Sequence, residues 1–229
     1  IYNISTNKWD DKILNLLKIK KHILPEVKNC ADNYGFIHDS IIGKSISITG
    51  VVGDQQSAAI GQCCFEPGSL KSTYGTGCFL MLNTGKNLVT SKNKLLTTIA
   101  YKLDGDITYA LEGSIFVAGS SIQYLRDKLN FFNSAEESEK FALEADPSSQ
   151  VFVVPAFTGL GAPHWKPEAK GAIFGLTLNS GMNEISLATL ESVAFQTKEL
   201  LNAMQADGAK VNSIKIDGGM SNNVFFSQL

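Results

Sequence analysis

Residues 45–61 read SISITGVVGDQQSAAIG, and the organisation of the chain is clearest in this stretch. Its first five residues alternate polar and apolar side chains, which is typical of a half-buried strand. The alternation stops at Gly50, and the small residues from Ser57 to Gly61 indicate a helix. Asp54 stands between them, at a strand-to-helix turn where α/β proteins place ligands. From this stretch alone, Asp54 is either a helix cap or a chemically active carboxylate.

The composition is that of a folded protein with a packed core. Of the 229 residues, 44% are hydrophobic and 18% are charged, and the formal net charge is -2. Basic and acidic residues are mixed, so we expect no nucleic-acid partner. No apolar run is long enough to span a bilayer. The four cysteines form no CxxC pair and the three histidines are far apart, which predicts no metal site and reduced cytoplasmic thiols.

Two more glycine-rich turns follow predicted strands. Gly75-Thr76-Gly77 lies between two β-rich runs and has the chemistry of a hairpin turn, although glycines around a threonine also suit a phosphate. Asp217-Gly218-Gly219 ends a strand predicted over 213–217 and precedes the last helix. It is either a tight turn or an anion site at a helix N-terminus.

Periodicity predicts the remaining elements. A second hairpin is expected to turn at 103–106, and a helix containing Gly119 is expected to follow. Gly119 is present either for close packing or for the approach of a ligand. Residues 135–145 form an acidic helix that we expect to face solvent. The longest predicted helix spans 183–206, with a core stripe of Leu187, Leu190, Ala194, Thr197, Leu201 and Met204.

Residues 1–40 are expected to be helical and polar. Trp9, Ile13, Leu16 and Leu17 would share one helix face. The chain starts at Ile1 and stops inside a predicted helix, so both ends look cut.

The three strand-to-turn segments, together with residues 158–165 and 171–177, strongly resemble the FGGY carbohydrate kinase family. The likeness covers nearly the whole chain and rests on several long motifs in a fixed order. It implies an α/β fold of the actin-like ATPase (ribonuclease H-like) type, mainly its second lobe. Residues 1–44 would be the end of the N-terminal lobe and a connector. Residues 45–229 would be a truncated C-terminal kinase lobe.

The resemblance also implies an activity, the ATP-dependent phosphorylation of glycerol to sn-glycerol 3-phosphate with Mg2+. Asp54 is then the expected general base, because a carboxylate within reach of a hydroxyl can take its proton. Glycerol would be bound by Asp54, Gln55 and Phe79. The nucleotide, ATP or ADP, would be bound by Thr76, Gly119, Gln123, Gly219 and Asn223. No side chain is assigned to a metal.

Two alternatives stay open. One is a sister FGGY kinase for another polyol or ketose. The other is a catalytically incomplete fragment or remnant that at most binds nucleotide or a partner chain, because the first-lobe motifs of the family are absent. The expected partners are glycerol, ATP or ADP, and either a separate chain that supplies the first lobe or further copies in a homo-oligomer.

Overall fold

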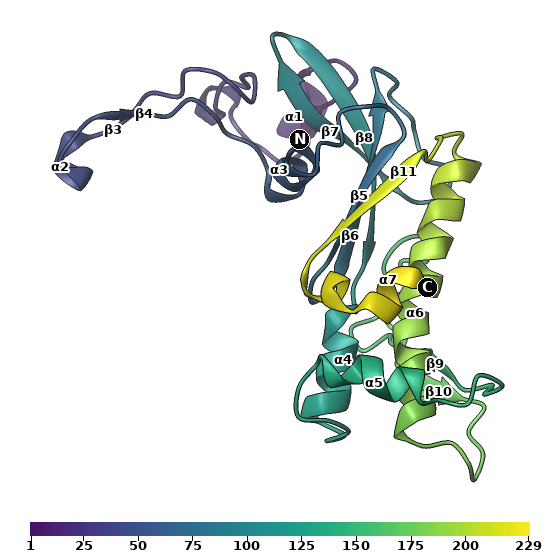
Figure 1. Cartoon of the computed structure of the whole chain (residues 1–229). Coiled ribbons are helices and arrows are strands. Elements are labelled where there is room, and N and C mark those ends of the chain that lie inside the picture. Colours follow the sequence, from purple (N-terminus) through teal and green to yellow (C-terminus); the bar gives the residue numbers. More distant parts are fainter.

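A five-stranded sheet forms the centre of the molecule (Figure 1). The computed structural model describes residues 1–229. In the order β11-β5-β6-β8-β7, the strands are β11 (Ser213–Asp217), β5 (Ser69–Tyr74), β6 (Cys78–Gly85), β8 (Asp106–Ile115) and β7 (Leu96–Leu103). β11 runs parallel to β5, and all other neighbours are antiparallel. Both predicted hairpins are therefore confirmed.

Short turns set the two hairpins. Asp104 and Gly105 have φ values of 50° and 85°. Positive φ at both central residues gives the turn a twist that matches the flanking strands. In the other hairpin, Tyr74 pairs with Cys78 across the turn formed by Gly75-Thr76-Gly77.

The two faces of the sheet are covered by different helices. On one face, α6 (Met182–Ala206) contributes Leu190, Val193, Leu200 and Met204 to the main core, where the strands supply Leu70, Leu80, Leu82, Leu111 and Ile115. On the other face, α3 (Asp54–Gly61) and the residues after it supply Ala59 and Cys64 to a smaller cluster with Met81, Ala100 and Ala110. Because side chains alternate along a strand, Leu70 faces α6 and Lys71 faces α3.

The buried stripe of α6 is broader than the predicted one. Leu190, Thr197 and Met204 are buried as predicted. Leu187, Ala194 and Leu201 are only partly buried, whereas the residue before each, Ser186, Val193 and Leu200, is buried. The helix packs against α4, α5, β8 and β9, so several sides of it are covered. A single apolar stripe does not locate the centre of such a wide buried face.

Short helices gather beside one end of the sheet (Figure 1). They are α4 (Gly119–Asp127), α5 (Glu137–Leu143) and α7 (Val224–Gln228), with the 3-10 turn η2 (Gly219–Asn222) before α7. The antiparallel pair of β9 (Phe152–Val154) and β10 (Ala172–Phe174) also lies against α6. The prediction that residues 135–145 face solvent is wrong in part, because α5 packs on α6 and α7 and buries Ser138 and Ala142.

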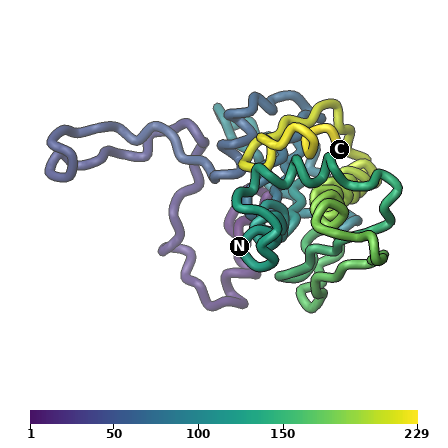
Figure 2. The backbone as a smooth tube through the Cα atoms, turned by 60° about the horizontal axis from the view of Figure 1, so that its bottom comes forward, coloured from purple at the N-terminus to yellow at the C-terminus, as the bar shows by residue number.

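The first 53 residues contain little regular structure, so the prediction of a helical region is wrong. Their elements are β1 (Tyr2–Asn3), β2 (Lys8–Trp9), α1 (Asp11–Leu16), η1 (Lys21–Ile23), β3 (Phe36–Ile37), α2 (Asp39–Ile42) and β4 (Ile46–Ser47). The predicted apolar face of α1 does not enter a core, since Leu16 is 80% exposed and Leu14 is the buried residue. Residues 36–47, here called the arm, extend away from the sheet (Figures 1 and 2). None of the helices is both long and apolar enough to cross a membrane.

Candidate functional site

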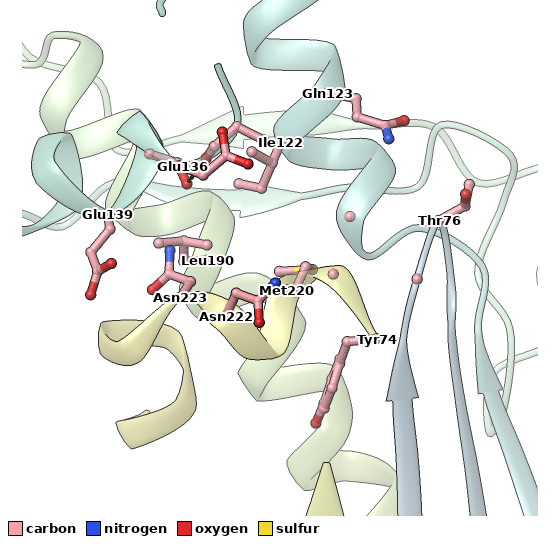
Figure 3. A pocket seen from close by; sticks show the side chains of 15 residues that line it. Tyr74, Thr76, Ile122, Gln123, Glu136, Glu139, Leu190, Met220, Asn222 and Asn223 are labelled. Carbon is pink, nitrogen blue, oxygen red and sulfur yellow. Dashed lines mark hydrogen bonds between the residues drawn. The ribbon is translucent and has the colours of Figure 1, made fainter. Parts of the chain in front are cut away.

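A pocket of about 360 Å3 opens where the ends of β5 and β11 meet α4 and α5 (Figure 3). Tyr74, Ile122 and Met220 give it apolar walls. The residues expected to contact a nucleotide come from three distant segments, and all of them line this pocket: Thr76, Gly119, Gln123, Gly219 and Asn223.

The turn between β5 and β6 holds the start of α4. The carbonyl oxygens of Gly75 and Thr76 accept the backbone N–H groups of Gly119 and Ser120 at 2.9 and 3.1 Å. These bonds satisfy amide groups that a helix start leaves without partners. A Cβ on Gly119 would lie 2.6 Å from the Gly75 carbonyl oxygen. Close backbone packing therefore accounts for this glycine.

The end of β11 wraps tightly around the end of β5. Gly218 has a φ of 89°, and a Cβ there would lie 2.4 Å from the Tyr74 carbonyl oxygen. The expected single helix after this turn is in fact η2 followed by α7, and Asn223 caps α7. Its Oδ1 accepts the N–H of Phe226 at 2.8 Å. Nδ2 of Asn223 makes no hydrogen bond within the chain and remains a donor at the pocket.

The pocket has two chemically different sides. Thr76 and Gln123 are exposed, and their side chains make no hydrogen bond within the chain. Glu136 and Glu139 lie on the opposite side, at α5 (Figure 3). The two carboxylates were not predicted as pocket residues, since an acidic surface helix gives no signal that it borders a pocket. Negative charge on one side sets a preferred orientation for a charged ligand.

Asp54, Gln55 and Phe79 lie together at a second place, around Lys71. Lys71 donates from Nζ to Oε1 of Gln55 at 2.5 Å and to the carbonyl oxygen of Phe79 at 3.2 Å. Lys71 is fully buried, and Phe79 is 40% exposed. The three residues predicted to contact glycerol do not line the pocket described above, but one buried ammonium connects their segments.

Asp54 is exposed and is the first residue of α3. Its Oδ1 accepts the N–H of Gln55 at 2.7 Å. The cap position belongs to Gly53, and no side chain caps the helix. The carboxylate is therefore not held as a helix cap. Acidic charge in the first turn is also favourable beside the helix dipole.

Two further carboxylates surround Lys71. Burial raises the pKa of Glu112, and the Lys71 charge partly offsets this. Burial lowers the pKa of Lys71, and the negative charges of Asp217, Glu112 and Asp54 oppose this shift. Sequence reasoning did not select Lys71 or Glu112. The sequence did carry a signal for both residues: each is a charged residue inside a strand, β5 or β8, whose other residues are suited to burial.

The cluster around Lys71 and the pocket share two strands. β5 carries Lys71 in the cluster and leads to Gly75 at the pocket, a distance of about 13 Å for four residues of extended chain. β11 ends at Asp217, whose Oδ2 accepts the Gln62 amide at 2.9 Å, and Gly219 follows at the pocket. The two sites therefore lie along the same strands.

Fold and sites together define the second lobe of an actin-like (ribonuclease H-like) kinase fold, with a pocket at strand ends and an exposed carboxylate at the start of α3. Residues 70–229 match the model of the FGGY family of carbohydrate kinases, C-terminal domain, and residues 1–61 match that of the N-terminal domain. The chain belongs to the FGGY family of carbohydrate kinases.

Curated relatives carry the name glycerol kinase. The protein from Rhizobium meliloti (strain 1021) is 56% identical over 223 residues, which cover 96% of this chain and 45% of the relative. Glycerol kinase 1 of Pseudomonas aeruginosa is 52% identical over 228 residues, covering 100% of this chain and 46% of the relative. The chain thus spans less than half the length of these relatives.

Solved structures give the same fold. The crystal structure of Plasmodium falciparum glycerol kinase with ADP has a TM-score of 0.92 and 39% identity, and covers 99% of this chain and 46% of that one. Xylulose kinase from Lactobacillus acidophilus has a TM-score of 0.85 at 22% identity, covering 100% of this chain and 47% of its own. The second likeness concerns the fold alone.

Proposed function

We propose that the chain supplies the nucleotide pocket and the general base of a kinase that phosphorylates glycerol to sn-glycerol 3-phosphate with ATP. One observation carries the proposal. The predicted nucleotide contacts come from three distant segments and line one pocket. This pocket shares β5 and β11 with the cluster around Lys71, to which Asp54 belongs. Glycerol kinases at 52% and 56% identity support glycerol over another polyol or ketose.

The two sides of the pocket suggest how the nucleotide lies. Glu136 and Glu139 would repel phosphates and accept a hydrogen bond from the amino group of adenine. The phosphates would then lie at Thr76, Gly119 and Gly219, on the other side. Nδ2 of Asn223 would lie near the base, whereas Gln123 shares the side of Thr76 and would lie near the phosphates (Figure 3). An adenine nucleotide suits this division of charge.

Phosphoryl transfer requires mainly positioning and the spreading of charge. Asp54 would take the proton from the attacking hydroxyl of glycerol as that oxygen bonds to the γ-phosphorus and the bond to the ADP oxygen breaks. Gln55 and Phe79 would hold the polyol, one by its amide and the other by its ring. The exposed carboxylate of Asp54 supports the base role, because it accepts a hydrogen bond only from the N–H of Gln55 and does not cap the helix.

Mg2+ belongs to the proposal as a companion of the nucleotide. No group of three or more His, Cys, Asp or Glu side chains is placed to hold a metal ion. Mg2+ in kinases is bound largely by substrate phosphates and water, with few protein ligands. We therefore assign no side chain of this chain to the ion and no step to it.

The active assembly that we propose includes the rest of the family's N-terminal lobe, on the same polypeptide or on a separate chain. The greater length of the relatives supports this. We also propose that the protein works in the cytoplasm, a location that its four free cysteines support.

A reconstitution experiment tests the function. The chain is mixed with the N-terminal lobe of the Rhizobium meliloti relative, and glycerol-dependent release of ADP is measured. We expect turnover in the mixture and none with the chain alone. ADP binding without turnover on any polyol would favour a nucleotide-binding remnant, and turnover on xylulose but not glycerol would favour a sister kinase. Absence of ADP binding would contradict the assignment of the pocket.

A further inference from the structure

We propose that Lys71 is a positioning residue for glycerol, which orients the Gln55 amide so that its N–H groups face the substrate and holds the backbone that carries Phe79. The inference rests on the proposed function, because it concerns the same substrate site. Gln55 and Phe79 were predicted as substrate contacts, whereas Lys71 was assigned no role.

The contacts of Lys71 connect the two segments that carry these side chains. Its ammonium reaches α3 through Oε1 of Gln55 at 2.5 Å and β6 through the carbonyl oxygen of Phe79 at 3.2 Å. Lys71 has 0% exposure, so these bonds form away from water. A movement of either segment would break a hydrogen bond to a buried charge, which is costly.

The chemistry of the ammonium fixes the orientation of the amide. A lysine ammonium only donates hydrogen bonds, so it must face the oxygen of Gln55 and not the nitrogen. Nε2 then points away from Lys71, and it makes no hydrogen bond within the chain. Two N–H donors are left for a ligand. They fit the lone pairs of an alcohol oxygen.

The charge of Lys71 is difficult to explain as simple packing. Burial of an ammonium is unfavourable, and a well-packed apolar side chain of similar size is often as stable or more stable. Here the charges of Asp217, Glu112 and Asp54, from the end of β11, from β8 and from α3, only partly offset the effect of burial on the pKa of Lys71. Retaining a cation at this position is therefore consistent with a role in the site.

Kinetics of the reconstituted kinase test the role. We expect Lys71→Met to raise the KM for glycerol about tenfold, the effect of losing roughly one charged hydrogen bond, with ADP affinity unchanged. Lys215→Met is the matched control. Lys215 pairs with Lys71 in the sheet register, but its Nζ bonds to the carbonyl oxygen of Gln62 at 2.7 Å. We expect the control to keep its KM for glycerol.

A double variant separates positioning from general stability. If Lys71 acts through Gln55, adding Lys71→Met to Gln55→Leu raises the KM for glycerol little beyond the rise that Gln55→Leu causes alone. Fully additive losses would overturn the proposal.

If Lys71→Met does not fold, Gln55→Glu decides, since it keeps an acceptor for Lys71 but removes both N–H donors. We expect about a tenfold rise in the KM for glycerol, and an unchanged KM would overturn the proposal.

A measurement on the chain alone keeps this inference separate from the function. Relaxation of the side-chain 15N of Gln55 reports how rigidly the amide is held. We expect an ordered amide in the unaltered chain and in Lys215→Met, and a mobile one in Lys71→Met. Equal order in all three would overturn the role of Lys71. A mobile amide in Lys71→Met together with a reconstituted mixture that does not phosphorylate glycerol would instead contradict the proposed function.

Discussion

Among the acidic side chains around Lys71, Asp54 is the exposed one, and its own hydrogen bond is local. Asp54→Asn keeps the size of the side chain and the start of α3, but it removes the proton acceptor. We expect turnover of the reconstituted kinase to fall by roughly a hundredfold to ten-thousandfold. The dissociation constant for ADP, measured by calorimetry, should not change. Asp106→Asn, at an exposed salt bridge with Lys86, is the control and should keep full activity.

Gly119 offers a second prediction at this scale. A Cβ at this position would meet backbone, the Gly75 carbonyl oxygen at 2.6 Å, so Gly119→Ala must displace the turn or α4. We expect a loss of about 1–3 kcal/mol in the free energy of unfolding and weaker binding of ADP. Urea unfolding and calorimetry measure the two effects.

Gly61→Ala is the matched control for that substitution. Gly61 is the last residue of α3, and no atom lies within 4 Å of the position of its Cβ. Replacing a helical glycine by alanine is expected to raise stability by up to about 1 kcal/mol. A stabilising effect of both substitutions would show that the contact between Gly119 and Gly75 is not tight.

Some residues of the site could be predicted from the sequence and others could not. The resemblance selected Thr76, Gln123 and Asn223, and the structure brings them to one pocket. It did not select Lys71, because a lysine in a strand predicts an exposed position unless the pairing of strands is known. The carboxylates around it come from other elements, and spacing along the chain does not reveal them.

At the scale of elements, the C-terminal end of α6 is held by a loop through Asp207. Its carboxylate accepts hydrogen bonds from the Ser91 hydroxyl, the Lys92 backbone N–H and the Asn93 amide. Burial alone would raise the pKa of Asp207, but these hydrogen bonds outweigh burial and the pKa is lowered. The carboxylate thus links two segments that lie more than a hundred residues apart in the sequence.

This link predicts a pH dependence of stability. Because the folded-state pKa lies below the unfolded value of about 3.9, the stabilisation is complete above that value and is lost as pH falls through the folded pKa. Asp207→Asn should therefore lower stability at neutral pH and reduce the loss on acidification. Urea unfolding at several pH values measures both effects, with Asp104→Asn in an exposed turn as the control. Parallel curves for Asp207→Asn and the unaltered chain would contradict the prediction.

The elements themselves were predictable where local chemistry determines them. The turn of Asp104 and Gly105 requires positive φ, and its sequence predicted a hairpin correctly. The prediction for α1 was wrong, since Ile13 and Leu16 in the helix and Leu17 directly after it remain exposed. Amphipathic spacing predicts which residues share a helix face, but not whether another element covers that face.

At the scale of the whole molecule, the arm is a segment that packs little against the rest of the chain. Phe36 is 66% exposed and Ile41 is 73% exposed, and the arm extends away from the rest of the molecule (Figure 2). We propose a structural boundary between residues 44 and 45, within the arm. The family models meet later, between residues 61 and 70, so residues 45–61 are still matched to the N-terminal domain. Limited trypsin digestion should cleave after Lys44 before it cleaves after Lys71, which is buried in β5.

The digestion should leave a large fragment that still binds ADP, because the pocket lies wholly after residue 73. Mass spectrometry identifies the cut, and calorimetry measures the binding. If cleavage within the sheet precedes cleavage in the arm, or if the fragment loses ADP affinity, the proposed boundary is wrong.

β5 has a consequence for the evolution of this site. The strand supplies a buried charge at Lys71 and leads to the turn that lines the pocket from Gly75 onward, and alternate residues face opposite helices. Deleting one residue between these positions would turn Lys71 towards the leucines that pack against α6, and inserting one would do the same. Only changes by two residues would keep the lysine on the α3 face. The length of this segment is therefore expected to be conserved more strictly than the identity of its middle residues.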